Sequence, residues 1–302
     1  MKLRSWLFIP GDSDKKLAKA DATGADALIL DLEDSVASAN KPLARQKVRA
    51  FLDERPAARR TSQLWVRINP LDDAALVDLA AVVGGAPEGI MLPKIDGPTD
   101  VLRLSHHLEA LEVRDGVPAG HIRILPVATE TPVAPLRLAE FASARLPRLI
   151  GLTWGAEDLS AAIGASTNLD EKGEWALTYR FARSSMLLAA KAAGVQAIDT
   201  LYVNFKDPEG LRSSCRAAAR EGFTGRIAIH PDQVAVINEA FAPSEEDVNF
   251  ARRVVAAFEA QSGAGTVGLD GKMLDIPHLK QAQQVLAMHE QYQRKAVRAP
   301  PR

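Results

Sequence analysis

The chain has 302 residues, of which 47% are hydrophobic and 25% charged, a composition typical of globular proteins and not of disordered or fibrous ones. The 37 basic and 38 acidic residues give a net charge of -1, which supplies no overall field to hold a nucleic acid or an anionic membrane. No apolar segment is long enough for a membrane span or a signal-peptide core, so we expect a cytoplasmic protein.

Short, mostly apolar runs alternate with amphipathic stretches up to residue 243. Such runs are typical of parallel strands buried on both faces, and the alternation predicts helices between them. Eight strand and helix pairs match the size of a (β/α)₈ TIM barrel, an α/β fold. A doubly wound open sheet is the second candidate, although no Gly-x-Gly-x-x-Gly follows any run. The expected strands are 6–10, 27–32, 64–69, 89–93, 123–129, 149–154, 196–203 and 226–230.

The alternation stops after residue 243, so we assign residues 1–243 to the barrel and 244–302 to a C-terminal segment. Ser244-Glu-Glu-Asp predicts a helix that starts there and runs to about residue 261. Asp270-Gly271 predicts a small hairpin, and a last helix is expected from Pro277 to about residue 291. This helix-hairpin-helix segment is too short for a core of its own, so we expect it to act as a lid on a barrel mouth.

Charged residues follow several of the expected strands at their C-terminal ends. In a parallel barrel these ends meet at one rim, which is where such folds place catalysis. Glu130 and Asp158 follow adjacent strands, and two protein carboxylates with water and substrate oxygens can complete the octahedron of Mg²⁺. The alternative is that they cap helices, because Glu157-Asp158 precedes Leu-Ser-Ala-Ala-Ile as a helix start would.

Arg67 and Lys94 are cations at the same rim. Arg67 leaves a buried strand and needs an anionic partner, either a carboxylate of the substrate or one of Asp31, Glu33 and Asp34 on the neighbouring strand. For Lys94, too, the partner is either an anionic group of the substrate or a carboxylate of the protein. Its use as a Schiff-base amine is a third reading, which the carboxylate-rich rim disfavours.

Several sequence motifs of this chain occur together in one family. The chain resembles, over nearly its whole length, the citrate lyase β-subunit-like family of the HpcH/HpaI aldolase group. The segment from Tyr202 to Gly210 resembles the stand-alone citramalyl-CoA and malyl-CoA lyases more than the subunits of citrate lyase complexes. The shared motifs are Gly24-Ala-Asp-Ala-Leu-Ile-Leu-Asp-Leu-Glu-Asp34, Val66-Arg-Ile-Asn69, Met91-Leu-Pro-Lys94, Glu130-Thr-Pro132, Gly155-Ala-Glu-Asp-Leu159, Ile229-His-Pro231 and Gly271-Lys-Met-Leu-Asp-Ile-Pro277.

The resemblance implies a metal-dependent active site. In this family Mg²⁺ would be bound by Glu130 and Asp158, while Arg67 would hold the carboxylate or keto-acid part of the substrate. Glu33 and Asp34 would support the metal and its waters, and a relay of the hydroxyl proton through Glu33 is a hypothesis.

The resemblance also implies contacts outside the metal shell. Gly155 and Ala156 would contact the substrate, and Asp275 would enter an active site as an acid/base group. The tail that carries Asp275 usually covers the mouth of an adjacent subunit, which implies a homo-oligomer, a trimer or a hexamer.

The activity implied is Mg²⁺-dependent cleavage of a short 3-hydroxyacyl-CoA of the citramalyl-CoA or malyl-CoA type, to a 2-keto acid and acetyl-CoA, possible in both directions. The enzyme alternatives are the citryl-thioester lyase subunit of a citrate lyase complex and an acyl-CoA thioesterase. An alternative of another class is a non-catalytic barrel that binds a ligand or serves in an assembly.

Overall fold

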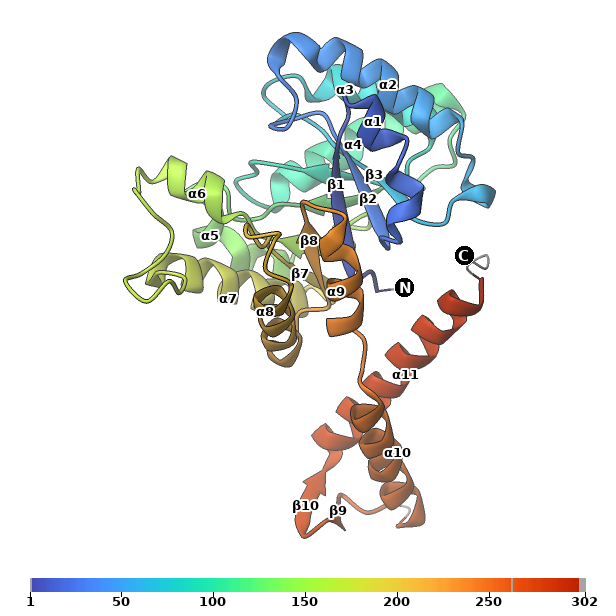
Figure 1. Ribbon diagram of the computed structural model, residues 1–302, viewed down its shortest axis with the longest axis vertical. Helices are drawn as coiled ribbons and strands as arrows, with labels where there is room; N and C mark the ends of the chain where they lie inside the picture. Colours follow the sequence, from blue (N-terminus) through green and yellow to red (C-terminus); the bar gives the residue numbers. More distant parts are fainter. Residues whose placement is uncertain (1, 262, 299–302) are drawn as a thin grey trace. The chain divides into compact units, whose positions relative to one another are not determined.

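The computed structural model describes residues 2–261 and 263–298. Its internal contacts divide the chain into two compact units, one formed by Leu3–Asn238 and one that joins Lys2 to residues 239–298 (Figure 1). The division falls within helix α9 (Asp232–Ala240), slightly before the expected boundary at residue 243.

The first unit is built on a parallel sheet of eight strands in its described residues, which confirms the TIM-barrel prediction. The strands are hydrogen-bonded in the order β5-β4-β3-β2-β1-β8-β7-β6. Parallel bridges from Ile124 to Leu149 and from Val127 to Thr153 join β5 to β6, so the order runs round a nearly closed circle. The strands are β1 (Ser5–Pro10), β2 (Ala27–Asp31), β3 (Gln63–Arg67), β4 (Gly89–Leu92), β5 (Arg123–Pro126), β6 (Gly151–Thr153), β7 (Gln196–Asp199) and β8 (Gly225–Ala228).

Helices lie around the outside of these strands (Figure 1). In the helix α2 (Lys41–Asp53) the buried residues are Ala44, Val48, Phe51 and Leu52. Their i, i+4, i+7, i+8 spacing places one apolar stripe against the sheet. After the fifth strand the chain forms a short helix, Ala134–Arg137, followed by a 3₁₀ segment, Leu138–Ala142. The helices of this unit are α1 (Asp14–Leu17), α2 (Lys41–Asp53), α3 (Ala75–Val82), α4 (Pro98–Asp115), α5 (Ala134–Arg137), α6 (Ala156–Ala162), α7 (Leu177–Ala192), α8 (Pro208–Glu221) and most of α9.

The barrel interior is filled by every second residue of the strands, as the two-residue side-chain period of a strand requires. Trp6 and Trp65 meet edge to face there, with ring centroids 5.0 Å apart. Ile29 lies opposite Trp65 in the β2–β3 register, and two residues further along each strand Asp31 lies opposite Arg67. The alternation that fills the core with apolar groups therefore ends on a charged pair.

The second unit consists of α10 (Glu245–Ala260), the hairpin β9 (Thr266–Leu269) and β10 (Lys272–Asp275), and α11 (Ile276–Arg298), as the sequence predicts (Figure 1). Ser244 caps α10 by accepting a hydrogen bond from the Asp247 N–H. The expectation that this segment lacks a core of its own is wrong. Its two helices and the hairpin bury a small apolar cluster, namely Ala251, Val254, Phe258, Val267, Leu274 and Ala282.

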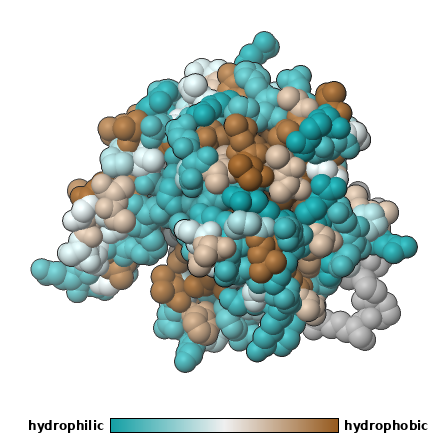
Figure 2. Space-filling model, turned by 90° about the horizontal axis from the view of Figure 1, so that it is seen from above, coloured by the Kyte–Doolittle hydropathy of each residue, from teal (hydrophilic) through white to brown (hydrophobic). Residues whose placement is uncertain are grey.

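The surface carries the mixture of groups that the composition predicts. Polar side chains cover most of the face seen in Figure 2, between separate apolar patches. None of the helices within residues 2–261 and 263–298 combines the length and the apolar character needed to cross a membrane.

Gly89 provides a test of the barrel packing. A Cβ at this position would lie 2.1 Å from the Trp65 ring, so we expect Gly89→Ala to lower the free energy of unfolding by about 1–3 kcal/mol. Chemical denaturation of this variant should be compared with Gly268→Ala, where the added Cβ meets nothing within 4 Å. Equal effects of the two substitutions would contradict this account of the core.

Candidate active site

Arg67 is held at the barrel mouth by two carboxylates and an aromatic ring. Its Nε and Nη2 donate to the two oxygens of Asp31 at 2.7 Å each, and its Nη1 lies 2.8 Å from Glu33 Oε2. The guanidinium carbon lies 4.4 Å from the centre of the Phe8 ring. Burial alone would raise the pKa of Asp31, but hydrogen bonds from Arg67 and its charge hold that pKa below its usual value. The structural partners expected for Arg67 are therefore present, and each terminal nitrogen keeps a second N–H for a ligand.

Lys94 contacts four carboxylates. Its backbone N–H donates to Glu130 Oε2 at 2.7 Å, and its ammonium contacts Glu33, Asp34 at 2.9 Å and Asp158 at 3.3 Å. Burial by itself would lower the pKa of Lys94, but these acids raise it above its usual value. A charged ammonium is not a nucleophile, so this geometry disfavours a Schiff base.

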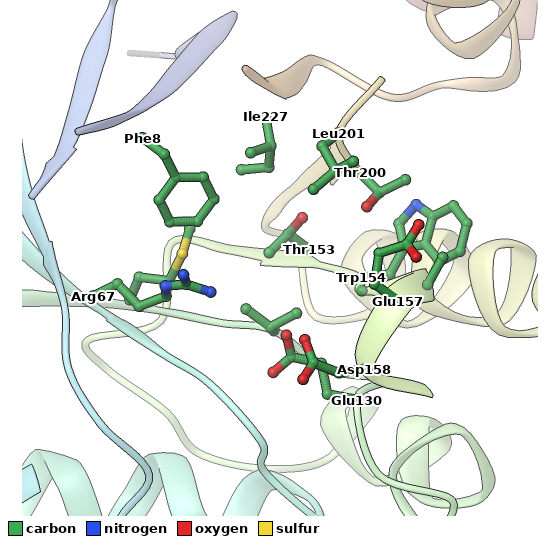
Figure 3. Close-up of a pocket in the computed structure, with 14 residues that line it drawn as sticks. Phe8, Arg67, Glu130, Thr153, Trp154, Glu157, Asp158, Thr200, Leu201 and Ile227 are labelled. Atoms are coloured by element: carbon green, nitrogen blue, oxygen red, sulfur yellow. The ribbon is translucent and has the colours of Figure 1, made fainter. Parts of the chain in front are cut away.

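Glu130 and Asp158 face the same pocket (Figure 3). Glu130 is 5% exposed, and burial together with the charge of Asp158 raises its pKa to about 8. Asp158 lies in the first turn of α6, whose N-cap position is Gly155. A Cβ on Gly155 would lie 2.8 Å from Glu130 Cγ, so the absence of a side chain there lets Glu130 reach the pocket.

The empty space of the pocket, part of which is continuous with the solvent, is about 450 Å³. Figure 3 shows Arg67 across the pocket from Glu130 and Asp158. The charged groups thus lie at one small cavity whose other walls are largely apolar. The apolar part of the lining includes Phe8, Met91, Val127, Trp154, Leu201 and Ile227.

Magnesium fits the chemistry of this site. Glu130 is buried beside a second carboxylate that opposes its ionisation, and a divalent cation between them would remove that repulsion. Hard oxygen ligands are those that Mg²⁺ prefers. Within the described residues no group of three or more His, Cys, Asp or Glu side chains is arranged to hold an ion. Two carboxylates would therefore leave the other coordination positions to water and substrate oxygens, which Mg²⁺ commonly retains.

Gly155 and Ala156 also line the pocket, and their contact with the substrate stays a prediction. Asp275 belongs to the second unit, where it ends β10 with its side chain half exposed. There His278 Nδ1 lies 2.5 Å from Asp275 Oδ1. Its role as an acid/base group stays a prediction.

Two features of the site escape sequence reasoning. Phe8 stacks on Arg67, and the only signal for it is its place in the inward-facing alternation of β1. Trp154 is anchored by its indole N–H, which donates to the buried Asp199 at 2.7 Å. Asp199 follows an apolar run at the end of β7 and could have been noticed by the same rule that identified the other strand-end acids.

The chain matches two family models, both of them of lyases. The model named "C-C_Bond_Lyase of the TIM-Barrel fold" matches residues 188–293, and the model named "HpcH/HpaI aldolase/citrate lyase" matches residues 4–231. The chain belongs to the HpcH/HpaI aldolase/citrate lyase family.

Similar proteins cover nearly the whole chain. Citrate lyase subunit beta of Haemophilus influenzae is 37% identical, over 95% of this chain and 97% of its own length. Mitochondrial citramalyl-CoA lyase of the mouse is 33% identical, over 94% of this chain and 85% of its own length. A crystal structure of protein CitE from Mycobacterium tuberculosis, in complex with magnesium, acetoacetate and coenzyme A, has a TM-score of 0.77 and 35% identity, covering 96% of this chain and 98% of that one.

The raised pKa of Glu130 gives a pH dependence that can be measured on metal-free protein. Between about pH 4.5 and about pH 8 the folded state keeps a proton that the unfolded chain has lost, so stability falls as pH rises through this window. The fall should be on the order of 1.4 kcal/mol per pH unit within the window.

Chemical denaturation of the wild type and of Glu130→Gln at several pH values checks this expectation. The variant should lose most of the slope, and Glu33, whose pKa is also raised by burial, contributes in the same direction. An unchanged slope in Glu130→Gln would show that Glu130 is ionised throughout.

Proposed function

We propose that this protein is a Mg²⁺-dependent carbon–carbon lyase that cleaves a short 3-hydroxyacyl-CoA thioester, of the citramalyl-CoA or malyl-CoA type, to a 2-keto acid and acetyl-CoA. Its family and its similarity to citramalyl-CoA lyase support the reaction class. The observation that carries the proposal is that Glu130 and Asp158 line one pocket with Arg67. The magnesium, acetoacetate and coenzyme A in the crystal structure of M. tuberculosis CitE support the choice of metal and of a CoA thioester as substrate.

In this proposal Glu130 and Asp158 hold the metal ion. When bound, Mg²⁺ would act as a Lewis acid on the oxygen atom that becomes the keto group. Lys94 holds Glu130 through its backbone N–H, and the position of Gly155 leaves room for that carboxylate. Glu130 is thereby oriented before any ligand enters, which is the arrangement that electrostatic catalysis needs.

Arg67 binds the carboxylate of the keto-acid part. Asp31 and Glu33 fix the orientation of the guanidinium, and Phe8 supports its face, so little rotamer freedom is lost when a ligand binds. Gly155 and Ala156 form the adjoining wall and contact the substrate. Glu33 and Asp34 support the water molecules around the metal. Both acids contact the ammonium of Lys94, which also contacts Asp158.

Asp275 is proposed to move the proton at the carbon of the acetyl thioester that is released. It lies at the end of a hairpin with its side chain half exposed, so its carboxylate is accessible to another protein surface. We propose that it acts in the site of a neighbouring subunit of a homo-oligomer, a trimer or a hexamer. We also propose that the protein is located in the cytoplasm.

A second candidate is the citryl-thioester lyase subunit of a citrate lyase complex. The 37% identity to citrate lyase subunit beta favours it, because that protein matches over almost its whole length. A thioesterase and a non-catalytic assembly subunit are the remaining alternatives, and the intact set of Arg67, Glu130 and Asp158 argues against the last.

A panel of CoA thioesters, incubated with the protein with and without Mg²⁺, tests the proposal. Release of acetyl-CoA together with a keto acid from citramalyl-CoA or malyl-CoA is expected. Free CoA without acetyl-CoA would indicate a thioesterase. No turnover of these CoA esters, with cleavage of a citryl thioester on an acyl carrier protein, would indicate the citrate lyase subunit.

Asp158→Ala should reduce Mg²⁺-dependent turnover by at least about 100-fold, because a metal ligand is worth at least as much as the groups that orient it. Circular dichroism and a denaturation curve would serve as controls for the fold. Wild-type activity in this variant would remove Asp158 from the metal site.

Asp275→Asn should reduce turnover by about 100-fold to 10,000-fold, the range of general acid/base catalysis, while Mg²⁺ affinity stays unchanged. Asp270→Asn is the matched control, because Asp270 is the other acid of the hairpin and pairs with Arg253. If Asp275→Asn keeps the rate of Asp270→Asn, the tail acid has no part in proton transfer.

A further inference from the structure

Lys94 connects the two acids proposed as metal ligands. Its backbone N–H donates to Glu130 at 2.7 Å, and its ammonium lies 3.3 Å from Asp158 Oδ1. The same ammonium contacts Glu33 and donates to Asp34 at 2.9 Å. The ammonium of Lys94 therefore contacts Asp158, one of the two proposed metal ligands, and also Glu33 and Asp34.

The backbone of Lys94 supports a specific role. Its φ of 51° lies in the left-handed region, which is uncommon for residues other than glycine. Such conformations persist where surrounding contacts over-determine them, and they cluster at functional sites. Here the conformation is retained at a residue whose N–H and ammonium both contact acids of the site.

The charges at the mouth are unequal. The described contacts of Arg67 and Lys94 join them to five carboxylates. Arg67 is engaged by Asp31 and Glu33, so the ammonium of Lys94 is the cation in contact with Asp158. The five acids are Asp31, Glu33, Asp34, Glu130 and Asp158.

We propose that Lys94 is a positioning residue that neutralises Asp158 in the metal-free protein and competes with Mg²⁺ for it, so that its charge weakens the affinity for the metal. This inference rests on the metal site in the proposed function. Metal binding then requires the ammonium to give up Asp158, while Glu33 and Asp34 remain as its partners. The competition favours metal binding together with an anionic substrate, whose carboxylate offsets the extra positive charge.

A purely structural role for Lys94 predicts the opposite effect. If Lys94 only fixed its loop, its removal would disorder the acids and weaken metal binding. If Lys94 competes with the metal, its removal leaves a more negative site and strengthens metal binding. The direction of the change in Mg²⁺ affinity therefore separates the two roles.

The test is titration calorimetry of chelator-treated protein with MgCl₂ in the absence of substrate. Lys94→Met should bind Mg²⁺ about tenfold more tightly than the wild type, since a unit charge close to a divalent ion is removed. Lys94→Arg keeps the charge and should stay within about threefold of the wild type. Lys47→Met is the matched control, because Lys47 forms an ion pair with Asp14 outside the site.

A second measurement covers variants that are marginally stable without metal. The thermal midpoint of Lys94→Met should be lower than that of the wild type without Mg²⁺ and should rise more steeply with Mg²⁺ concentration. Equal or weaker Mg²⁺ binding by Lys94→Met, in a wild type that binds the metal, would overturn this inference alone. A wild type that binds no Mg²⁺ would overturn the proposed metal site as well.

Discussion

The repulsion among carboxylates at the barrel mouth is the constraint on which the rest of the site depends. Parallel strands deliver their C-terminal side chains to one rim, and in this chain that rim receives more acids than bases. Asp31, Glu33 and Glu130 are almost fully buried there, where water cannot screen their charges. The acids of such a cluster must be paired with cations or protonated, and here Arg67 and Lys94 pair with Asp31 and Glu33 while the pKa of Glu130 is raised.

The two cations divide this task differently. Arg67 forms a rigid two-point contact with Asp31 and lies against Phe8, so it is fixed by the fold itself. Lys94 distributes one charge over several oxygens on a flexible stem, so its contacts can be exchanged. In the proposed function, one fixed and one exchangeable cation would allow the site to accept both an anionic substrate and a divalent metal.

Much of the fold was predictable because each barrel strand is a continuous apolar run, and an apolar run buried on both faces leaves few alternatives to a parallel sheet. The acids Glu130 and Asp158 were predictable by the same route, since each follows such a run. The small core of the C-terminal unit was not, because its apolar residues come from α10, β9, β10 and α11 and become one cluster only when these pack together. The role of Gly155 in leaving space for the Glu130 side chain also could not be predicted, because it depends on how closely the two residues approach in the fold.

The sequence by itself determined the strands, the charged residues that follow them and the family motifs, because these depend on local patterns along the chain. Only the tertiary structure decided which charges meet. Asp31 pairs with Arg67 through the register of β2 and β3, and Lys94 reaches Asp158 because the loop after β4 and the first turn of α6 meet at one rim. Coulomb interactions and burial depend on distances between residues far apart in the chain, so the raised pKa of Glu130 could not be inferred until those distances were known.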